Sequence, residues 1–196
     1  MTKNDLRQRI GALRKTLSDT EIRLYTESIL DKVVKSPEYM NSDELFVYVN
    51  CKKEVPTLPL IMHALDKGKK VAVPRVEGDK MEFYHISEVE DLEPGYMGIF
   101  EPVIANVAQA GNALMIMPAL AFDHDFYRLG YGGGYYDRYI NEHPQSHFIK
   151  MGLAYNFQYL KHNLIESEWY DRQVDIIVTP DKVYRRPDYV SDLSDK

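Results

Sequence analysis

The sequence predicts an α/β fold, and three observations lead to this prediction. Short runs rich in Val, Ile and Leu alternate with segments whose apolar residues recur every three or four positions, as strands separated by helices do. With 196 residues, 44% of them hydrophobic, the chain can bury a core without disulfides or metals. No internal repeat or linker divides it. We therefore expect one three-layer, doubly wound domain with a largely parallel central sheet over residues 1–186, and a polar, frayed tail over residues 187–196.

Four helices are expected. Residues 3–17 carry an apolar stripe at helical spacing, and the Ser-Asp-Thr-Glu pattern of residues 18–21 is a capping box that opens a second helix. That helix is closed by Ser36-Pro37. The two remaining helices are expected over residues 57–67 and 135–141.

Six strands are expected from short apolar, β-branched or aromatic runs. They span residues 45–49, 70–74, 81–86, 114–117, 148–154 and 174–178. Residues 90–112 hold several prolines and glycines and are expected to be mainly connection. In a doubly wound sheet ligands bind beyond the carboxyl ends of the strands, so the segments that follow Val49, Pro74, Pro118 and Thr179 are the candidate site.

Composition narrows the class of protein. Cys51 is the only cysteine, so no internal disulfide is possible. The first residues lack the pattern of a secretory signal, and no apolar run approaches the roughly 20 residues that span a bilayer. The net charge of −6 opposes general nucleic-acid binding. We expect a cytoplasmic protein with neither a nucleic-acid nor a membrane partner, and a monomer, although the sequence does not reveal the oligomeric state.

A glycine-rich segment is the most distinctive local feature. Four of the five residues 130–134 are glycine, with Arg128 before them and Asp137 after them. Glycines let a ligand approach the main chain, and successive N–H groups can converge on an anion. Arg128 suits phosphate, and Asp137 could hold a phosphate-bound divalent metal. An ordinary glycine-rich loop is equally open from spacing alone, but the position beyond a predicted strand end favours phosphate.

Three other groups of residues have two interpretations each. Lys3, Arg7 and Arg14 share one face of the first helix; a solvated basic face is favoured over a cationic arm that reaches toward phosphates. Glu54, after a predicted strand, is either a surface residue or an acceptor for the amino groups of a heterocycle. Among the aspartates, Asp137, Asp171 and Asp175 are possible Mg²⁺ ligands, with Asp175 equally plausible as a structural residue. Asp123 and Asp125 favour a turn.

No covalent nucleophile is evident, since the chain has no G-x-S-x-G motif and no histidine close in sequence to Cys51. Four motifs do stand in order along nearly the full chain. They are K-x-x-L-R at residues 3–7, E-(I/V)-x-T at residues 54–57, G-(I/L)-x-E-P at residues 98–102, and P-x-x-x-F-D…R-(L/V/F)-G-x-G-x-G-(Y/F)-Y-D-R from Pro118 to Arg138. Together they resemble the motifs of the 5-formyltetrahydrofolate cyclo-ligase family, also called methenyltetrahydrofolate synthetases.

This resemblance implies that 5-formyltetrahydrofolate and ATP are converted into 5,10-methenyltetrahydrofolate, ADP and phosphate with Mg²⁺ as cofactor. It also implies roles for residues at the matching positions. Arg128 and Asp137 are the expected catalytic residues. ATP would contact Lys3, Asn4, Asp5, Leu6 and Arg7, and also Arg128, Leu129, Gly130, Tyr131, Gly132, Gly133, Gly134, Tyr135 and Tyr136. The folate would contact Val49, Glu54, Tyr131, Gly132, Gly133, Gly134 and Tyr135. The metal would lie at Asp137 and Asp171.

Two positions depart from the family pattern. Tyr170 stands where a histidine usually precedes the second aspartate, and Ala119 stands where glycine is common.

Two alternative functions stay open: a different phosphotransferase on the same scaffold, or a non-catalytic protein that binds nucleotide and folate and sequesters 5-formyltetrahydrofolate.

Overall fold

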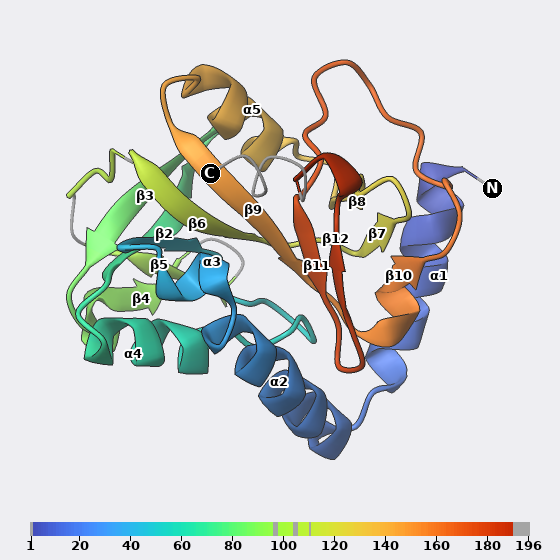
Figure 1. Cartoon of the computed structure of the whole chain (residues 1–196), viewed down its shortest axis with the longest axis horizontal. Helices are drawn as coiled ribbons and strands as arrows, with labels where there is room; N and C mark the ends of the chain where they lie inside the picture. Colours follow the sequence, from blue (N-terminus) through green and yellow to red (C-terminus); the bar gives the residue numbers. More distant parts are fainter. Residues whose placement is uncertain (1, 96–97, 104–105, 110, 190–196) are drawn as a thin grey trace.

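A seven-stranded sheet runs through the middle of the computed structural model, which describes residues 2–95, 98–103, 106–109 and 111–189 (Figure 1). The inner strands are mutually parallel, and the two edge strands pair antiparallel with their neighbours. The expected largely parallel α/β sheet is confirmed. In spatial order its strands are β12 (Val183–Arg185), β11 (Ile176–Val178), β9 (His147–Leu153), β6 (Asn112–Met117), β1 (Glu44–Val47), β2 (Lys70–Glu77) and β3 (Lys80–Ile86).

Helices cover both faces of this sheet and make it the middle of three layers (Figure 1). One face is covered by α2 (Asp19–Val34), α3 (Pro37–Met40) and α4 (Leu58–Asp66), and the other by α5 (Tyr135–Glu142). Successive side chains of a strand point to opposite faces. Accordingly, Leu45 and Val47 of β1 pack in the cluster that includes α2 and α4, whereas Phe46 packs in the cluster that includes Tyr139 of α5.

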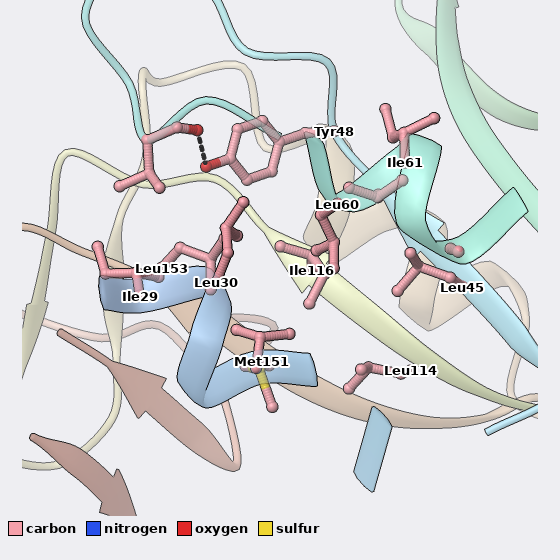
Figure 2. Packing of buried hydrophobic residues seen from close by; sticks show 14 of the residues in the cluster. Ile29, Leu30, Leu45, Tyr48, Leu60, Ile61, Leu114, Ile116, Met151 and Leu153 are labelled. Atoms are coloured by element: carbon pink, nitrogen blue, oxygen red, sulfur yellow. Dashed lines mark hydrogen bonds between the residues drawn. The ribbon is translucent and has the colours of Figure 1, made fainter. Parts of the chain in front are cut away.

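The larger of these two clusters is almost completely buried. Figure 2 shows Ile29 of α2 and Leu60 of α4 gathered around strand residues such as Ile116, and all three side chains are almost completely buried. Truncating a side chain of this size in such a core costs about 2–5 kcal/mol of the free energy of unfolding. The cluster thus fixes α2 and α4 against the strands whose carboxyl ends form the site.

The first helix, α1 (Lys3–Thr16), does not pack on the central sheet. It begins with a capping box between Thr2 and Asp5. Its buried Leu6 and Ile10 lie against a small satellite sheet, in one cluster with Leu129. Figure 1 shows α1 beside that sheet, whose strands in spatial order are β10 (Tyr159–Leu160), β7 (Ala121–Asp123) and β8 (Arg128–Leu129). This packing brings α1 to the segment that follows β8, where the glycines lie.

Several short elements escaped the sequence analysis. The segment 90–112, expected to be connection, contains a two-stranded sheet, and β6 already begins at Asn112. Strands of two or three residues are too short for a periodic pattern. Helix α3 was not expected either, because Ser36-Pro37 marks not only the end of the preceding helix but also the start of α3, with Ser36 as its N-cap. The other elements not expected are η1 (Val89–Asp91), β4 (Leu92–Pro94), β5 (Phe100–Pro102), β7, β8, η3 (Asn156–Gln158), β10 and β12.

The expected strand at residues 70–74 was too short, because β2 continues through Pro74 to Glu77. Proline lacks the N–H that a central strand needs. The pairing of β2 with β1 ends at Ala72, however, so Pro74 lies beyond the ladder on that side and pairs only with β3.

At the end of the described chain, the side chain of Tyr189 is buried and its hydroxyl lies 3.5 Å from Oε1 of Glu38. This residue belongs to the segment expected to be a frayed tail, of which residues 190–196 lie outside the described part. None of the described helices combines the length and the apolar character that crossing a bilayer requires.

Candidate functional site

The glycine segment forms an exposed turn between β8 and α5. Gly132 has a φ of +106° and Gly134 a φ of +65°, backbone angles that side chains with a Cβ rarely adopt. Gly134 is the N-cap of α5, and no side chain caps the helix there. The N–H groups of the first turn of α5 therefore lack a side-chain acceptor, and the helix dipole places partial positive charge at the same point. This geometry suits an anion such as phosphate.

A buried ion pair lies behind the turn. Nη2 of Arg128 is 2.9 Å from Oδ2 of Asp137, and the two side chains are 8% and 10% exposed. The backbone N–H of Arg172 donates to Oδ1 of Asp137 at 2.9 Å. Burial raises the pKa of Asp137, and the neighbouring Arg128 opposes that shift. The pair holds a cation and a carboxylate where α5 begins.

Helix α1 contributes cations to the turn. Nε of Arg7 donates to the carbonyl of Gly130 at 3.0 Å, and Nη1 of Arg14 donates to the hydroxyl of Tyr131 at 2.7 Å. Arg14 is only 5% exposed. The solvated basic face that the sequence favoured is therefore wrong for Arg14, and the cationic arm that reaches toward phosphates stays a prediction. Lys3 lies farther out, with Nζ 3.9 Å from Oδ2 of Asp171.

Glu54 is the buried acid of the site. It lies in the loop after β1, is 6% exposed, and accepts the N–H of Cys51 at 2.8 Å through Oε2. Its other oxygen accepts the hydroxyl of Tyr131. Because Arg14 can only donate and the carboxylate can only accept, the Tyr131 hydroxyl accepts from the first and donates to the second. One tyrosine thus joins the glycine turn to Glu54, and the surface interpretation of Glu54 is wrong.

The cysteine in this loop is not an activated nucleophile. Burial and the nearby Glu54 raise the pKa of Cys51 to about 11, so the sulfur stays a thiol at neutral pH. Val49, also in the loop after β1, is half-buried and packs against the larger core cluster.

The three candidate metal ligands separate into two environments. Asp175 is 4% exposed, and its carboxylate binds Lys150 at 2.9 Å and Arg186 at 3.0 Å, which makes it a structural residue. Asp171 is near enough to Asp137 to raise the pKa of that carboxyl. In the part of the chain that the structure describes, no three His, Cys, Asp or Glu side chains form a group that could hold a metal ion.

Some of the residues expected to contact ligands have side chains that are buried in the core or that stabilise a helix end. Leu6 and Leu129 are each 1% exposed and belong to the cluster under α1. Asp5 accepts the N–H of Thr2 at 2.9 Å and caps α1, whereas Asn4 is exposed. Leu6 and Leu129 can therefore meet a ligand at most through the backbone. Asp123 accepts from the N–H groups two and four residues later, which confirms its turn role.

Sequence reasoning missed several residues around the turn. Arg138 donates to the carbonyls of Gly133 at 2.6 Å and of Asp79 at 3.0 Å, and the hydroxyl of Tyr135 donates to the carbonyl of Gly78 at 3.3 Å. The β2–β3 turn therefore braces the glycine turn. Arg138 could have been found from its place at the end of the long motif, but no local signal pointed to the β2–β3 turn.

Comparisons with known proteins agree with this architecture. The model of the 5-formyltetrahydrofolate cyclo-ligase family matches residues 1–180. A probable 5-formyltetrahydrofolate cyclo-ligase of Schizosaccharomyces pombe is 34% identical over 200 residues, covering 94% of this chain and 98% of that protein. The solution structure of 5,10-methenyltetrahydrofolate synthetase from Aquifex aeolicus superposes with a TM-score of 0.83 at 33% identity, covering 95% and 94% of the two chains. The corresponding synthetase from Mycoplasma pneumoniae gives a TM-score of 0.73 at 26% identity, covering 92% and 99%.

Proposed function

Because this chain belongs to the 5-formyltetrahydrofolate cyclo-ligase family, its activity is the conversion of 5-formyltetrahydrofolate into methenyltetrahydrofolate, and we propose that it uses ATP and Mg²⁺ to do so. The observation that carries the nucleotide part is the uncapped start of α5 beside the buried Arg128–Asp137 pair. Backbone N–H groups, a helix dipole and a guanidinium meet at this one exposed turn. That combination suits a polyphosphate.

Arg128 is the residue best suited to the transferring phosphoryl group. Its guanidinium is almost buried, and its Nε has no hydrogen-bond partner among the described residues. A buried donor without a partner is costly, and a phosphate oxygen would satisfy it. Arg7 and Lys3, at the start of α1, would add positive charge along the outer phosphates. The residue types and the free donor thus support ATP as the co-substrate.

The donor set at this turn is compatible with Mg²⁺. Magnesium prefers oxygen ligands and usually takes one or two carboxylates together with substrate phosphates and water. Asp137 and Asp171 supply two neighbouring carboxylates, and the absence of a larger ligand cluster among the described residues fits an ion that arrives with the nucleotide. When bound, the ion would neutralise charge on the phosphates. Asp137 and Asp171 are the side chains proposed to hold it.

Phosphorylation of the formyl oxygen accounts for the need for ATP. A formamide oxygen is a poor leaving group, and phosphorylation of this oxygen converts it into a good one. N10 of the folate then attacks the activated formyl carbon, and phosphate departs as the ring closes. Both nucleophiles belong to the substrates, which agrees with a site whose only cysteine stays a thiol. The protein's role is alignment and stabilisation of charge.

Glu54 is the proposed contact for the pterin. Its carboxylate is buried, and its Oε1 accepts the hydroxyl of Tyr131, a residue that is 46% exposed. The amino and ring N–H groups of a pterin are donors that could form hydrogen bonds to this oxygen. The loop that carries Glu54 follows β1, next to the strand that precedes the satellite sheet, so the pterin and the glycine turn would be neighbours.

The decisive experiment is an activity assay on the purified protein. With 5-formyltetrahydrofolate, ATP and Mg²⁺ we expect the near-UV absorbance of the methenyl product, and no product when ATP or Mg²⁺ is omitted. Binding of both ligands without product would instead favour a protein that sequesters 5-formyltetrahydrofolate. ATP consumption only with a different acceptor would favour another phosphotransferase.

A further inference from the structure

The hydroxyl of Tyr136 is buried and has no hydrogen-bond partner among the described residues. The residue lies in the first turn of α5, directly before Asp137. Its ring packs against both large core clusters, which occupy opposite faces of the central sheet. A side chain that contacts both clusters lies at the margin of the sheet that separates them. Since α5 begins at the turn after β8, Tyr136 lies at the end where ligands of such folds bind.

Neighbouring tyrosines make the free hydroxyl unusual. The hydroxyl of Tyr48 donates to the carbonyl of Val55 at 2.9 Å, as Figure 2 shows, and the hydroxyl of Tyr155 donates to the carbonyl of Glu54 at 3.2 Å. The hydroxyl of Tyr131 donates to Glu54 itself. A buried polar group without a partner destabilises the folded protein. Tyr136 therefore carries a donor that the fold itself does not use.

The charged surroundings of this hydroxyl identify what it can meet. The guanidinium carbon of Arg128 lies 5.9 Å from the centre of the Tyr136 ring. A tyrosine hydroxyl is ordinarily neutral at physiological pH and can donate a hydrogen bond. The Tyr136 hydroxyl lies within electrostatic reach of Glu54, the proposed pterin contact, and of Arg128, the proposed phosphate contact.

Resting on the function proposed above, we propose that the Tyr136 hydroxyl donates a hydrogen bond to the oxygen that joins the formyl carbon to phosphorus in the phosphorylated folate. In the ring-closing step N10 forms a bond to that carbon and loses its proton. The carbon–oxygen bond breaks, its electron pair stays on the oxygen, and the departing phosphate takes up the N10 proton. The oxygen gains negative charge in this step, so a donor aimed at it stabilises the transition state.

The Tyr136→Phe variant tests this role, because it removes the hydroxyl and keeps the ring. We expect kcat to fall roughly tenfold to hundredfold, as for loss of a hydrogen bond to a charged group, with little change in KM for either substrate. In rapid-quench experiments ADP should still form at nearly the wild-type rate while the methenyl absorbance appears slowly. The ratio of ADP to methenyl product should rise above one, because the activated folate hydrolyses before it closes.

The matched control is Tyr48→Phe, which removes a hydroxyl that does have a partner. This variant should lower Tm by about 2–4 °C, since a satisfied buried hydrogen bond is lost and the Val55 carbonyl is left unpaired. Tyr136→Phe should not lower Tm, because its hydroxyl has no partner to lose.

Three outcomes would overturn the proposal: wild-type kcat in Tyr136→Phe, a Tm loss as large as that of Tyr48→Phe, or ADP formation slowed as much as ring closure. The activity of the unaltered protein, measured in parallel, separates these results from a failure of the proposed function. In that case the unaltered protein would form no methenyl product at all.

Discussion

Arg128 and Asp137 lie on opposite sides of the glycine turn, yet their side chains meet at 2.9 Å and are almost buried. The strand β8 holds one of them and the first turn of α5 holds the other. The pair therefore closes the base of the turn and fixes its two ends relative to each other. Its charges face the place where a phosphate and its metal are proposed to bind, so the same contact supports both the fold and the site.

Replacing Arg128 with alanine should affect both stability and nucleotide use. Removing one partner of a buried ion pair leaves the other charge unpaired and costs about 3–5 kcal/mol. We expect a lower midpoint in urea and a higher KM for ATP, measured by denaturation and steady-state kinetics. Arg23→Ala removes an exposed cation paired with Glu27 at 3.1 Å, and it should change neither quantity appreciably. Near-normal ATP kinetics in a folded Arg128→Ala protein would contradict the assigned role.

Asp137→Asn should weaken the dependence of turnover on Mg²⁺, because the amide is a poorer ligand for a hard cation. We expect a shift of the Mg²⁺ titration of kcat/KM to higher concentration, roughly tenfold or more, the effect of about 1.4 kcal/mol of binding energy. Asp175→Asn alters a structural carboxylate and should reduce stability without moving that titration. A normal Mg²⁺ titration for Asp137→Asn would remove this residue from the proposed metal site.

The pH dependence of turnover should also involve Asp137. Burial raises its folded-state pKa above the ordinary 3.8, so the folded protein takes up this proton at a higher pH than the unfolded chain does. Protonation of this group therefore stabilises folding as the pH falls, and that contribution declines as the pH rises through the folded pKa. The ionised form that would hold the metal is lost on acidification. We expect an acid limb in the pH profile of kcat/KM above pH 3.8, absent from Asp137→Asn. An identical limb in the variant would assign it elsewhere.

Gly132→Ala tests the backbone of the turn. The added methyl group would meet nothing closer than Arg7 at 4.0 Å, so any effect comes from the φ of +106°. A left-handed backbone costs about 1–2 kcal/mol in residues with a Cβ. We expect lower stability and weaker ATP binding by calorimetry. Gly11→Ala, within α1 and in open space, should instead add about 0.5–1 kcal/mol. Equal behaviour of the two variants would exclude a special role for the turn conformation.

Glu54→Gln should change the KM for one substrate and not for the other. Loss of the negative charge weakens hydrogen bonds from pterin amino groups, and we expect KM for 5-formyltetrahydrofolate to rise about tenfold to hundredfold with KM for ATP nearly unchanged. Glu27→Gln changes an exposed helical glutamate and should leave both values as they are. Should KM for ATP rise instead, Glu54 would belong to the nucleotide side of the site.

The features that were predictable from the sequence are those that depend on residues close together in the chain. Runs of apolar residues marked the inner strands of the sheet, and the capping box at Ser18 marked the start of α2. The glycines between Arg128 and Asp137 could be recognised as a candidate turn, since each residue type has its own conformational and chemical preference. Except for β11, which lies within a longer apolar run, the strands of two or three residues could not be predicted, because a period needs several repeats before it can be detected.

The sequence by itself determined the α/β class, the family and the turn, because periodicity, residue chemistry and motif order are properties of neighbouring residues. Only the tertiary structure decided that α1 packs on the satellite sheet, that Arg14 reaches Tyr131 across 117 residues, and that Tyr131 reaches Glu54 across 77. It alone also revealed that the buried hydroxyl of Tyr136 has no hydrogen-bond partner among the residues that the structure describes. A helical pattern shows that a face is buried but not which surface buries it, and that choice depends on how the whole chain packs.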